Sequence, residues 1–229
     1  MINFIHTAGR ALRNRKKFYG KKENFKVTHW FDDINDITKV EKQYQLILLD
    51  RDCTLQKDHA YERASKFEKT LQQISKKSEI VSNSSFKEFL RIGLVYGDLF
   101  PANKLVRLKG EKRLTLLRVQ NDNLAAYHYD PKTNKTTQVL LENPNLEPLI
   151  AEEFKKPEPI ILKAILALHK NPKTLVVGDY YHTDIVCGNL AGTDTAYVTP
   201  YKPLSQNIPL ILFRYLFDTP LGKLKSKNL

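Results

Sequence analysis

The chain has 229 residues, of which 41% are hydrophobic and 27% are charged, with 37 Lys and Arg against 25 Asp and Glu for a net charge of +12. This composition excludes a disordered chain, favours one α/β domain over two small ones, and predicts a surface that attracts polyanions. No apolar run is long enough to cross a bilayer. Cys53 and Cys187 have no CxxC spacing, which excludes a disulfide framework and a zinc cage and favours a reducing compartment.

Residues 1–22 carry seven basic residues and no acid. Apolar residues between the basic ones give this segment the pattern of a mitochondrial targeting peptide, and it lacks the apolar core of a secretory signal. The alternative is an ordered basic arm that binds RNA, anionic lipid or a neighbouring subunit. Residues 23–229 are predicted to form the α/β domain.

In the first half of that domain the sequence pattern predicts alternating strands and helices. Residues 25–37 read as a short extended piece and a turn. The run 45–49 is apolar throughout, which is typical of a strand buried on both faces of a parallel sheet, and it stops at Asp50. The next predicted elements, from the spacing of apolar residues, are a helix in 60–77, a strand at 79–81 and a helix at 86–92.

The second half repeats this alternation after an interruption. Residues 105–141 are predicted to form a β insertion, with β segments at 114–119, 124–129 and 136–141. Its role has three alternatives: a lid, a surface that binds a partner, or a decorated edge of the sheet. A helix at 160–169 and strands at 173–177 and 195–198 follow, and the whole pattern predicts a doubly wound parallel sheet, where ligands collect beyond the carboxyl ends of the strands.

Acidic residues follow two of the predicted strands. Asp50 and Asp52 come after the first, and Asp179 and Asp184 come after the strand at 173–177. Carboxylates that lie close together repel one another unless a cation or a shared proton separates them. A hard divalent cation such as Mg²⁺ is therefore one interpretation, because it takes oxygen ligands. The other is a polar turn in which Asp and Thr cap the next helix.

Two further positions suit a phosphate group. Ser82 and Asn83 follow the strand at 79–81 and offer a hydroxyl and an amide, and Lys156 precedes the helix at 160–169 and can neutralise phosphoryl charge. Taken singly, a serine there is also explained as a helix cap, and a lysine as a solvated surface residue.

In this order, Asp50-x-Asp52-x-Thr54, Ser82, Lys156 and Gly178-Asp179-x-x-x-Thr183-Asp184 resemble the four motifs of the haloacid dehalogenase (HAD) superfamily of phosphatases. Within that superfamily, segments 80–83, 155–157, 176–185 and 188–192 resemble the mitochondrial phosphatidylglycerophosphatase family and its bacterial relatives. The similarity covers residues 25–95 and 150–205. It implies a HAD-type Rossmann-like parallel sheet with flanking helices, and it places the β insertion between the second and third motifs.

The resemblance also implies roles for these residues. Asp50 would attack phosphorus and form an aspartyl-phosphate, Asp52 would act as acid and then base while its main-chain carbonyl binds metal, and Lys156 would balance charge. The implied catalytic residues are thus Asp50, Asp52 and Lys156. The implied Mg²⁺ ligands are Asp50, Asp52, Asp179 and Asp184, and the implied substrate-binding residues are Thr54, Ser82 and Asn83.

The chain departs from the family pattern at four positions: Arg51 where Lys is frequent, Cys53 where Asn is common, and Tyr180 and Tyr181 where Arg and Leu are more usual. No histidine lies beside Cys53 in the sequence, so packing explains this residue better than nucleophilic chemistry. His182 has two interpretations, one lining the site and the other packing or surface.

The expected function is Mg²⁺-dependent dephosphorylation of phosphatidylglycerophosphate to phosphatidylglycerol in cardiolipin synthesis, by a peripheral protein at the matrix face of the inner mitochondrial membrane. The C-terminal stretch 208–217 is too short to span a membrane, and it fits either docking on anionic lipid or a packed terminal helix. The rival expectations are a soluble-substrate phosphatase of the same chemistry, and a HAD-fold structural subunit of a ribosome or respiratory complex.

Overall fold

The computed structural model describes residues 21–57, 60, 62–141, 146–202, 212, 218 and 219. The predictions for the basic arm and for the C-terminal stretch 208–217 therefore lie almost wholly outside the described residues. Within the described residues, no helix combines the length and the apolar character that crossing a bilayer requires.

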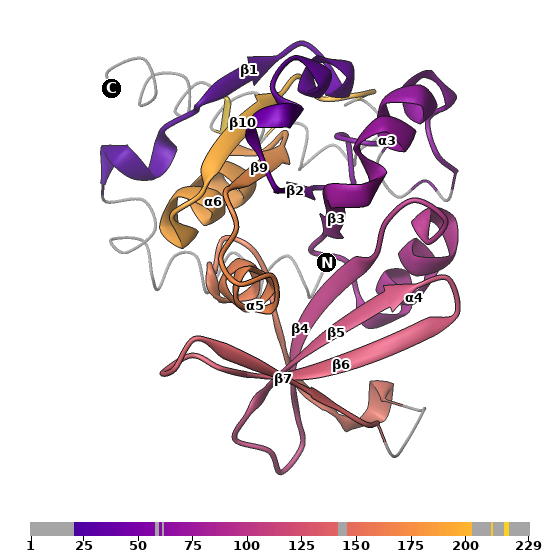
Figure 1. Cartoon of the computed structure of the whole chain (residues 1–229), viewed down its shortest axis with the longest axis vertical. Coiled ribbons are helices and arrows are strands. Elements are labelled where there is room, and N and C mark those ends of the chain that lie inside the picture. Colours follow the sequence, from indigo (N-terminus) through magenta and orange to yellow (C-terminus); the bar gives the residue numbers. More distant parts are fainter. Residues whose placement is uncertain are drawn as a thin grey trace.

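One ten-stranded sheet organises the fold, in the order β1-β10-β9-β2-β3-β4-β5-β6-β7, with β8 paired to β4 (Figure 1). The first six strands in that order, β1, β10, β9, β2, β3 and β4, are parallel to one another, whereas β5, β6, β7 and β8 pair antiparallel. The predicted α/β fold with a parallel sheet is thus confirmed. The strands are β1 His29–Phe31, β2 Leu46–Leu49, β3 Ser78–Val81, β4 Ala102–Leu108, β5 Leu114–Gln120, β6 Asn123–Asp130, β7 Lys135–Val139, β8 Ile150–Phe154, β9 Thr174–Gly178 and β10 Asp194–Val198.

Helices cover both faces of the parallel strands, with α3 and α4 on one side and α5 and α6 on the other (Figure 1). Their bounds are α3 Glu68–Ile74, α4 Phe86–Tyr96, α5 Ile160–Leu168 and α6 Val186–Ala191. Short helical turns connect these elements in the part of the chain from 21 to 202 that the structure describes: η1 Lys22–Phe25, η2 Ile34–Lys39, η3 Glu41–Gln43, η4 Ser65–Phe67, η5 Ser75–Lys77, η6 Glu147–Leu149 and η7 Tyr181–Ile185.

The two helical layers explain the unbroken apolar run of β2. Ile47 and Leu49 pack in the cluster that contains the apolar residues of α3 and α4, whereas Leu46 and Leu48 pack in the cluster that contains those of α5. Because successive side chains of a strand point to opposite faces, a strand between two helical layers is apolar at every position.

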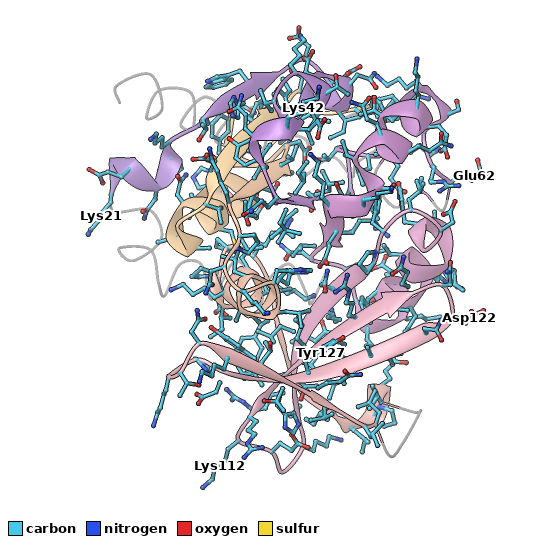
Figure 2. The ribbon with its side chains drawn as sticks, in the orientation of Figure 1. Lys21, Lys42, Glu62, Lys112, Asp122 and Tyr127 are labelled. Atoms are coloured by element: carbon cyan, nitrogen blue, oxygen red, sulfur yellow. The ribbon has the colours of Figure 1, made fainter. Side chains whose placement is uncertain are left out.

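The antiparallel part is longer than the predicted insertion at 105–141. It begins in β4, whose first residues pair with β3, and it returns through β8, which pairs with β4 from Leu105 to Leu108. β5, β6 and β7 continue the same sheet outward, and their turns carry the exposed Lys112 and Asp122 (Figure 2). The outermost strand, β7, presents mostly exposed polar residues at the open edge of the sheet.

Lys104 places a buried cation in β4. Its Nζ donates to the carbonyl oxygen of Ser84 at 2.6 Å and lies 3.4 Å from Oε2 of Glu153. Burial lowers the pKa of Lys104 to about 8, and the attraction of Glu153 offsets this only in part. The folded protein thus holds this proton less tightly than the unfolded chain.

A pH dependence of stability follows from that difference. Between pH 8 and 10.5 the unfolded chain keeps the Lys104 proton and the folded protein loses it, so the free energy of unfolding rises with pH, by about 3 kcal/mol. We expect Lys104→Met to abolish this rise in urea unfolding measured across that range. The exposed Lys163 provides the control, and equal rises in Lys104→Met and Lys163→Met would contradict the assignment.

Candidate functional site

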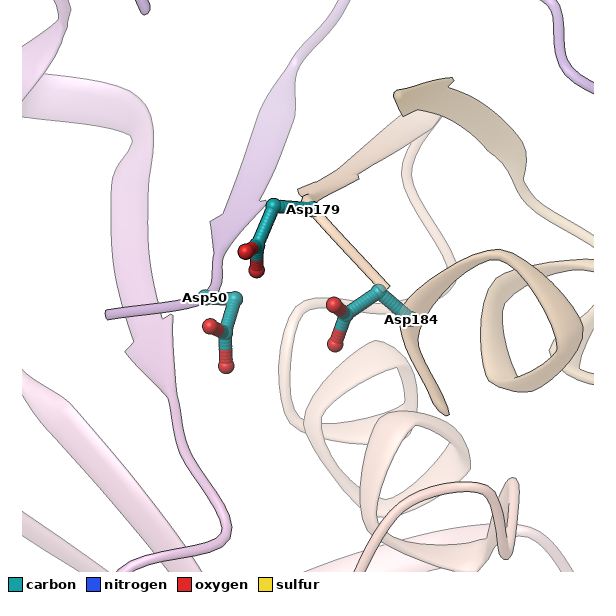
Figure 3. Close-up of side chains that lie close together, drawn as sticks. All are labelled: Asp50, Asp179 and Asp184. Atoms are coloured by element: carbon teal, nitrogen blue, oxygen red, sulfur yellow. The ribbon is translucent and has the colours of Figure 1, made fainter. Parts of the chain in front are cut away.

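Three carboxylates meet at the carboxyl edge of the parallel strands (Figure 3). Asp50 follows β2 and Asp179 follows β9, and these strands are parallel neighbours with Leu49 opposite Val177. Asp184 belongs to the turn η7, which follows β9. One carboxylate oxygen from each aspartate lies within 4.8 Å of the other two.

Gly178 leaves the space that the Asp184 carboxylate occupies at this edge of the sheet. A Cβ atom at Gly178 would lie 2.3 Å from Cγ of Asp184, so any larger residue would displace that carboxylate. The main-chain N–H of Tyr180 donates to Oδ2 of Asp184 at 3.1 Å, which fixes the carboxylate against the end of β9. Asp184 is 1% exposed and Asp179 is fully buried.

Lys156 lies between two of the three carboxylates. Its Nζ donates to Oδ1 of Asp50 and to Oδ1 of Asp184, at 2.5 Å each, and the residue is 3% exposed. β8 brings it there: β8 pairs with the edge of β4 that also pairs with β3, so the residues after Phe154 arrive where β3 ends. The Asn83 side chain then holds the main chain of Lys156, accepting from its N–H at 2.7 Å and donating to its carbonyl oxygen at 3.2 Å.

Burial and charge set the protonation of the cluster. Burial raises the pKa of Asp50 to about 7; Lys156 opposes the rise, and the charges of Asp184 and Asp52 add to it. Burial alone would lower the pKa of Lys156, but the charges of Asp184 and Asp50 outweigh it and raise that pKa well above its ordinary value. Lys156 is therefore an ammonium group at neutral pH, surrounded by an excess of negative charge.

The donor set fits a hard divalent cation. Three carboxylates and one ammonium give a formal charge of −3 + 1 = −2 when all are ionised, which one divalent cation balances. All three acidic donors are oxygens, the ligand type of Mg²⁺. Asp50, Asp179 and Asp184 are the side chains that would hold such an ion.

The family comparison concerns the part of the chain that contains Lys156, Asp179 and Asp184. Residues 153–200 match the family model described as HAD-hydrolase-like. The mostly parallel sheet with helices on both faces is consistent with a HAD Rossmann-like fold. No curated protein and no solved structure matched the chain. The match supports a HAD-like hydrolase, and it leaves the substrate open.

The carboxylate of Asp52 lies outside the group formed by Asp50, Asp179 and Asp184. Arg51 donates to both of its oxygens, from Nε to Oδ1 at 3.0 Å and from Nη2 to Oδ2 at 2.8 Å. The Arg51 side chain is 2% exposed and that of Asp52 is 23% exposed. The carboxylate of Asp52 is not in the group of three, so of Asp52 only the main-chain carbonyl remains as an implied metal ligand.

Two residues predicted to bind substrate bond to other residues of the site. Thr54 is fully buried and donates to Oδ1 of Asp179 at 3.3 Å, and the Asn83 amide bonds to the main chain of Lys156. These bonds place both side chains at the site as supports for Asp179 and Lys156, and substrate binding by Thr54 and Asn83 stays a prediction. Ser82 is half-buried directly after β3, the strand next to β2 at this edge.

The surroundings of Cys53 and His182 favour a packing role for both side chains. Cys53 is fully buried and has a φ of 58°, in the left-handed region that asparagine tolerates better than most residues. His182 bonds through Nδ1 to Asp218, which favours its packing interpretation. The sequence pattern indicated no role for Asp218, and it marked Arg51 only as a departure from the family pattern. No local pattern marks Asp218, which lies 34 residues beyond Asp184, whereas the motif itself contains Arg51.

Proposed function

We propose that the protein is a Mg²⁺-dependent phosphomonoesterase that acts through an aspartyl-phosphate on Asp50. The observation that carries this proposal is the position of Lys156, hydrogen-bonded to Asp50 and Asp184 in a group of three carboxylates of which two are buried. Bound Mg²⁺ would supply positive charge to the phosphoryl oxygens and keep the nucleophile ionised. Asp50, Asp179 and Asp184 would hold it.

The proposed reaction has two displacements. In the first, a carboxylate oxygen of Asp50 bonds to phosphorus as the bond to the alkoxide leaving group breaks, and Asp52 gives that alkoxide its proton. In the second, Asp52 takes a proton from water, the water oxygen bonds to phosphorus, and the bond to Asp50 breaks to release phosphate. Lys156 neutralises charge on Asp50 and the phosphoryl group, and Ser82 donates a hydrogen bond to a phosphoryl oxygen.

For the substrate, we propose phosphatidylglycerophosphate, hydrolysed to phosphatidylglycerol at the matrix face of the inner mitochondrial membrane. Support comes from the resemblance of the segments around Ser82, Lys156 and Asp179 to that phosphatase family. The net charge of +12 also favours binding of a peripheral protein to an anionic lipid surface.

The test is phosphate release by the purified full chain. We expect release from phosphatidylglycerophosphate in vesicles of anionic phospholipid when Mg²⁺ is present, and none when EDTA replaces it. Soluble phosphomonoesters form the second arm. Release from these alone would favour the soluble-substrate phosphatase, and release from neither would contradict phosphatase activity altogether.

A second candidate is a structural subunit of a large mitochondrial assembly, bound to RNA or protein through the basic arm. The observation that favours it is the bonding of both Asp52 oxygens to Arg51, which leaves the implied acid engaged. Sedimentation of a mitochondrial extract separates the candidates. A stoichiometric place in a heavy particle supports the structural subunit, and a small free species supports the enzyme.

A further inference from the structure

Asp218 is a buried carboxylate bonded to the turn that carries Asp184. Its side chain is fully buried. Oδ2 accepts from the main-chain N–H of Tyr181 at 3.1 Å, and Oδ1 accepts from the main-chain N–H of His182 at 2.9 Å. Oδ1 also lies 2.5 Å from Nδ1 of His182. One aspartate thus bonds to three groups on two consecutive residues.

These bonds complete the start of a helical segment. Tyr181 and His182 open η7, which leads directly into α6, and the first N–H groups of a helix have no acceptor within it. Tyr180, in the N-cap position, supplies no side-chain acceptor. Asp218 takes that role from a distant part of the chain. The carboxylate also suits the positive end of the peptide dipoles.

The same turn forms one side of the proposed Mg²⁺ site. It begins two residues after Asp179, it contains Asp184, and Asp184 N–H donates to the Tyr180 carbonyl oxygen at 2.9 Å. Any movement of the main chain at 181 and 182 therefore moves the Asp184 carboxylate relative to Asp50 and Lys156. The His182 ring packs at 5.3 Å, edge to face, on Phe25, which adds the N-terminal side of the domain to this contact.

We propose that Asp218 is a positioning residue for the Mg²⁺ site, and that it sets the Mg²⁺ affinity by fixing the turn Tyr181–Ile185. This inference rests on the proposed function, because it assumes that Asp50, Asp179 and Asp184 hold the ion. Groups that orient metal ligands without touching the metal typically change the affinity by about 10- to 100-fold when removed.

Mg²⁺ binding to the full-length protein, measured by titration calorimetry, tests the inference. We expect Asp218→Ala to raise the dissociation constant for Mg²⁺ by about tenfold or more. Asp218→Asn keeps one acceptor oxygen, and we expect it to give a smaller increase. Asp33→Ala is the matched control, because Asp33 also accepts a main-chain N–H at the start of a helical turn, from Asn35 at 2.8 Å, and it does not contact the turn Tyr181–Ile185.

Thermal unfolding of all variants without metal separates positioning from general loss of stability. A loss of Mg²⁺ affinity in Asp218→Ala that exceeds that of Asp33→Ala at comparable stability supports the inference. Equal affinities in Asp218→Ala and wild type, or equal losses in both alanine variants, overturn it. If Asp218→Ala does not fold, the same comparison is made with Asp218→Asn. A wild-type protein that binds no Mg²⁺ overturns the proposed function and, with it, this inference.

Discussion

Replacing Asp50 with asparagine is expected to lower the rate of phosphate release by about 10³-fold or more, because the variant lacks the nucleophile. The amide oxygen can still accept the hydrogen bond from Nζ of Lys156, so the fold should persist.

The measurement is Mg²⁺-dependent phosphate release by Asp50→Asn and wild type at equal concentration, with a thermal melt of each. Asp122→Asn serves as the control, because Asp122 is an exposed acid in the turn between β5 and β6 (Figure 2). Wild-type rates in the Asp122 variant and a stable but inactive Asp50 variant are the expected pair of results. Undiminished release by Asp50→Asn would exclude Asp50 as the nucleophile.

The second large effect is expected on stability, from Lys156→Met. The variant removes the ammonium group that bonds to Asp50 and Asp184 and leaves their buried charges unbalanced. Breaking a buried ion pair in this way costs about 3–5 kcal/mol of unfolding free energy. Burial raises the pKa of Asp50 to about 7, so this carboxylate gains a proton as the pH is lowered and the cost should shrink.

Urea unfolding in EDTA and in Mg²⁺ measures this effect. Mg²⁺ should restore part of the lost stability, because it binds the folded site and supplies positive charge there. Lys155→Met is the control, since Lys155 is adjacent in sequence but pairs with Glu153, at 3.4 Å, outside the cluster. If Lys156→Met were as stable as wild type in EDTA, the buried charges would not depend on the lysine.

Local sequence was sufficient to predict the part of the site built by parallel strands. The apolar runs that became β2 and β9 have helices on both faces, and each is followed directly by an aspartate. Since parallel neighbours end at the same edge of a sheet, the approach of Asp50 to Asp179 follows from the strand pattern alone.

The position of Lys156 beside Asp50 and Asp184 was not predictable in the same way. Glu152 and Glu153 break the apolar pattern of β8, which is a strand because it pairs with β4. Pairing between segments about forty residues apart in sequence leaves no periodic signal in either. The sequence therefore indicated Lys156 as a suitable residue, whereas the strand pairing that places it at the site is seen only in the folded sheet.

The hydrogen-bond partners of the polar side chains at the site could not be predicted from residue type alone. Thr54 and Asn83 carry groups suited to phosphate, yet they bond to Asp179 and to the main chain of Lys156. Arg51 bonds to the neighbouring Asp52 and Asp218 to a turn far from it in sequence. Each of these choices depends on which groups folding brings within hydrogen-bond distance.

The open edge at β7 has a consequence for self-association. A sheet that ends in a bare row of main-chain N–H and C=O groups invites another copy to add its own strand there. Lys135 at the start of β7 and the threonines and glutamine that follow place charge and polar groups along this edge. A second copy that paired parallel and in register along β7 would bring Lys135 against Lys135, which disfavours fibre-like extension of the sheet in that register.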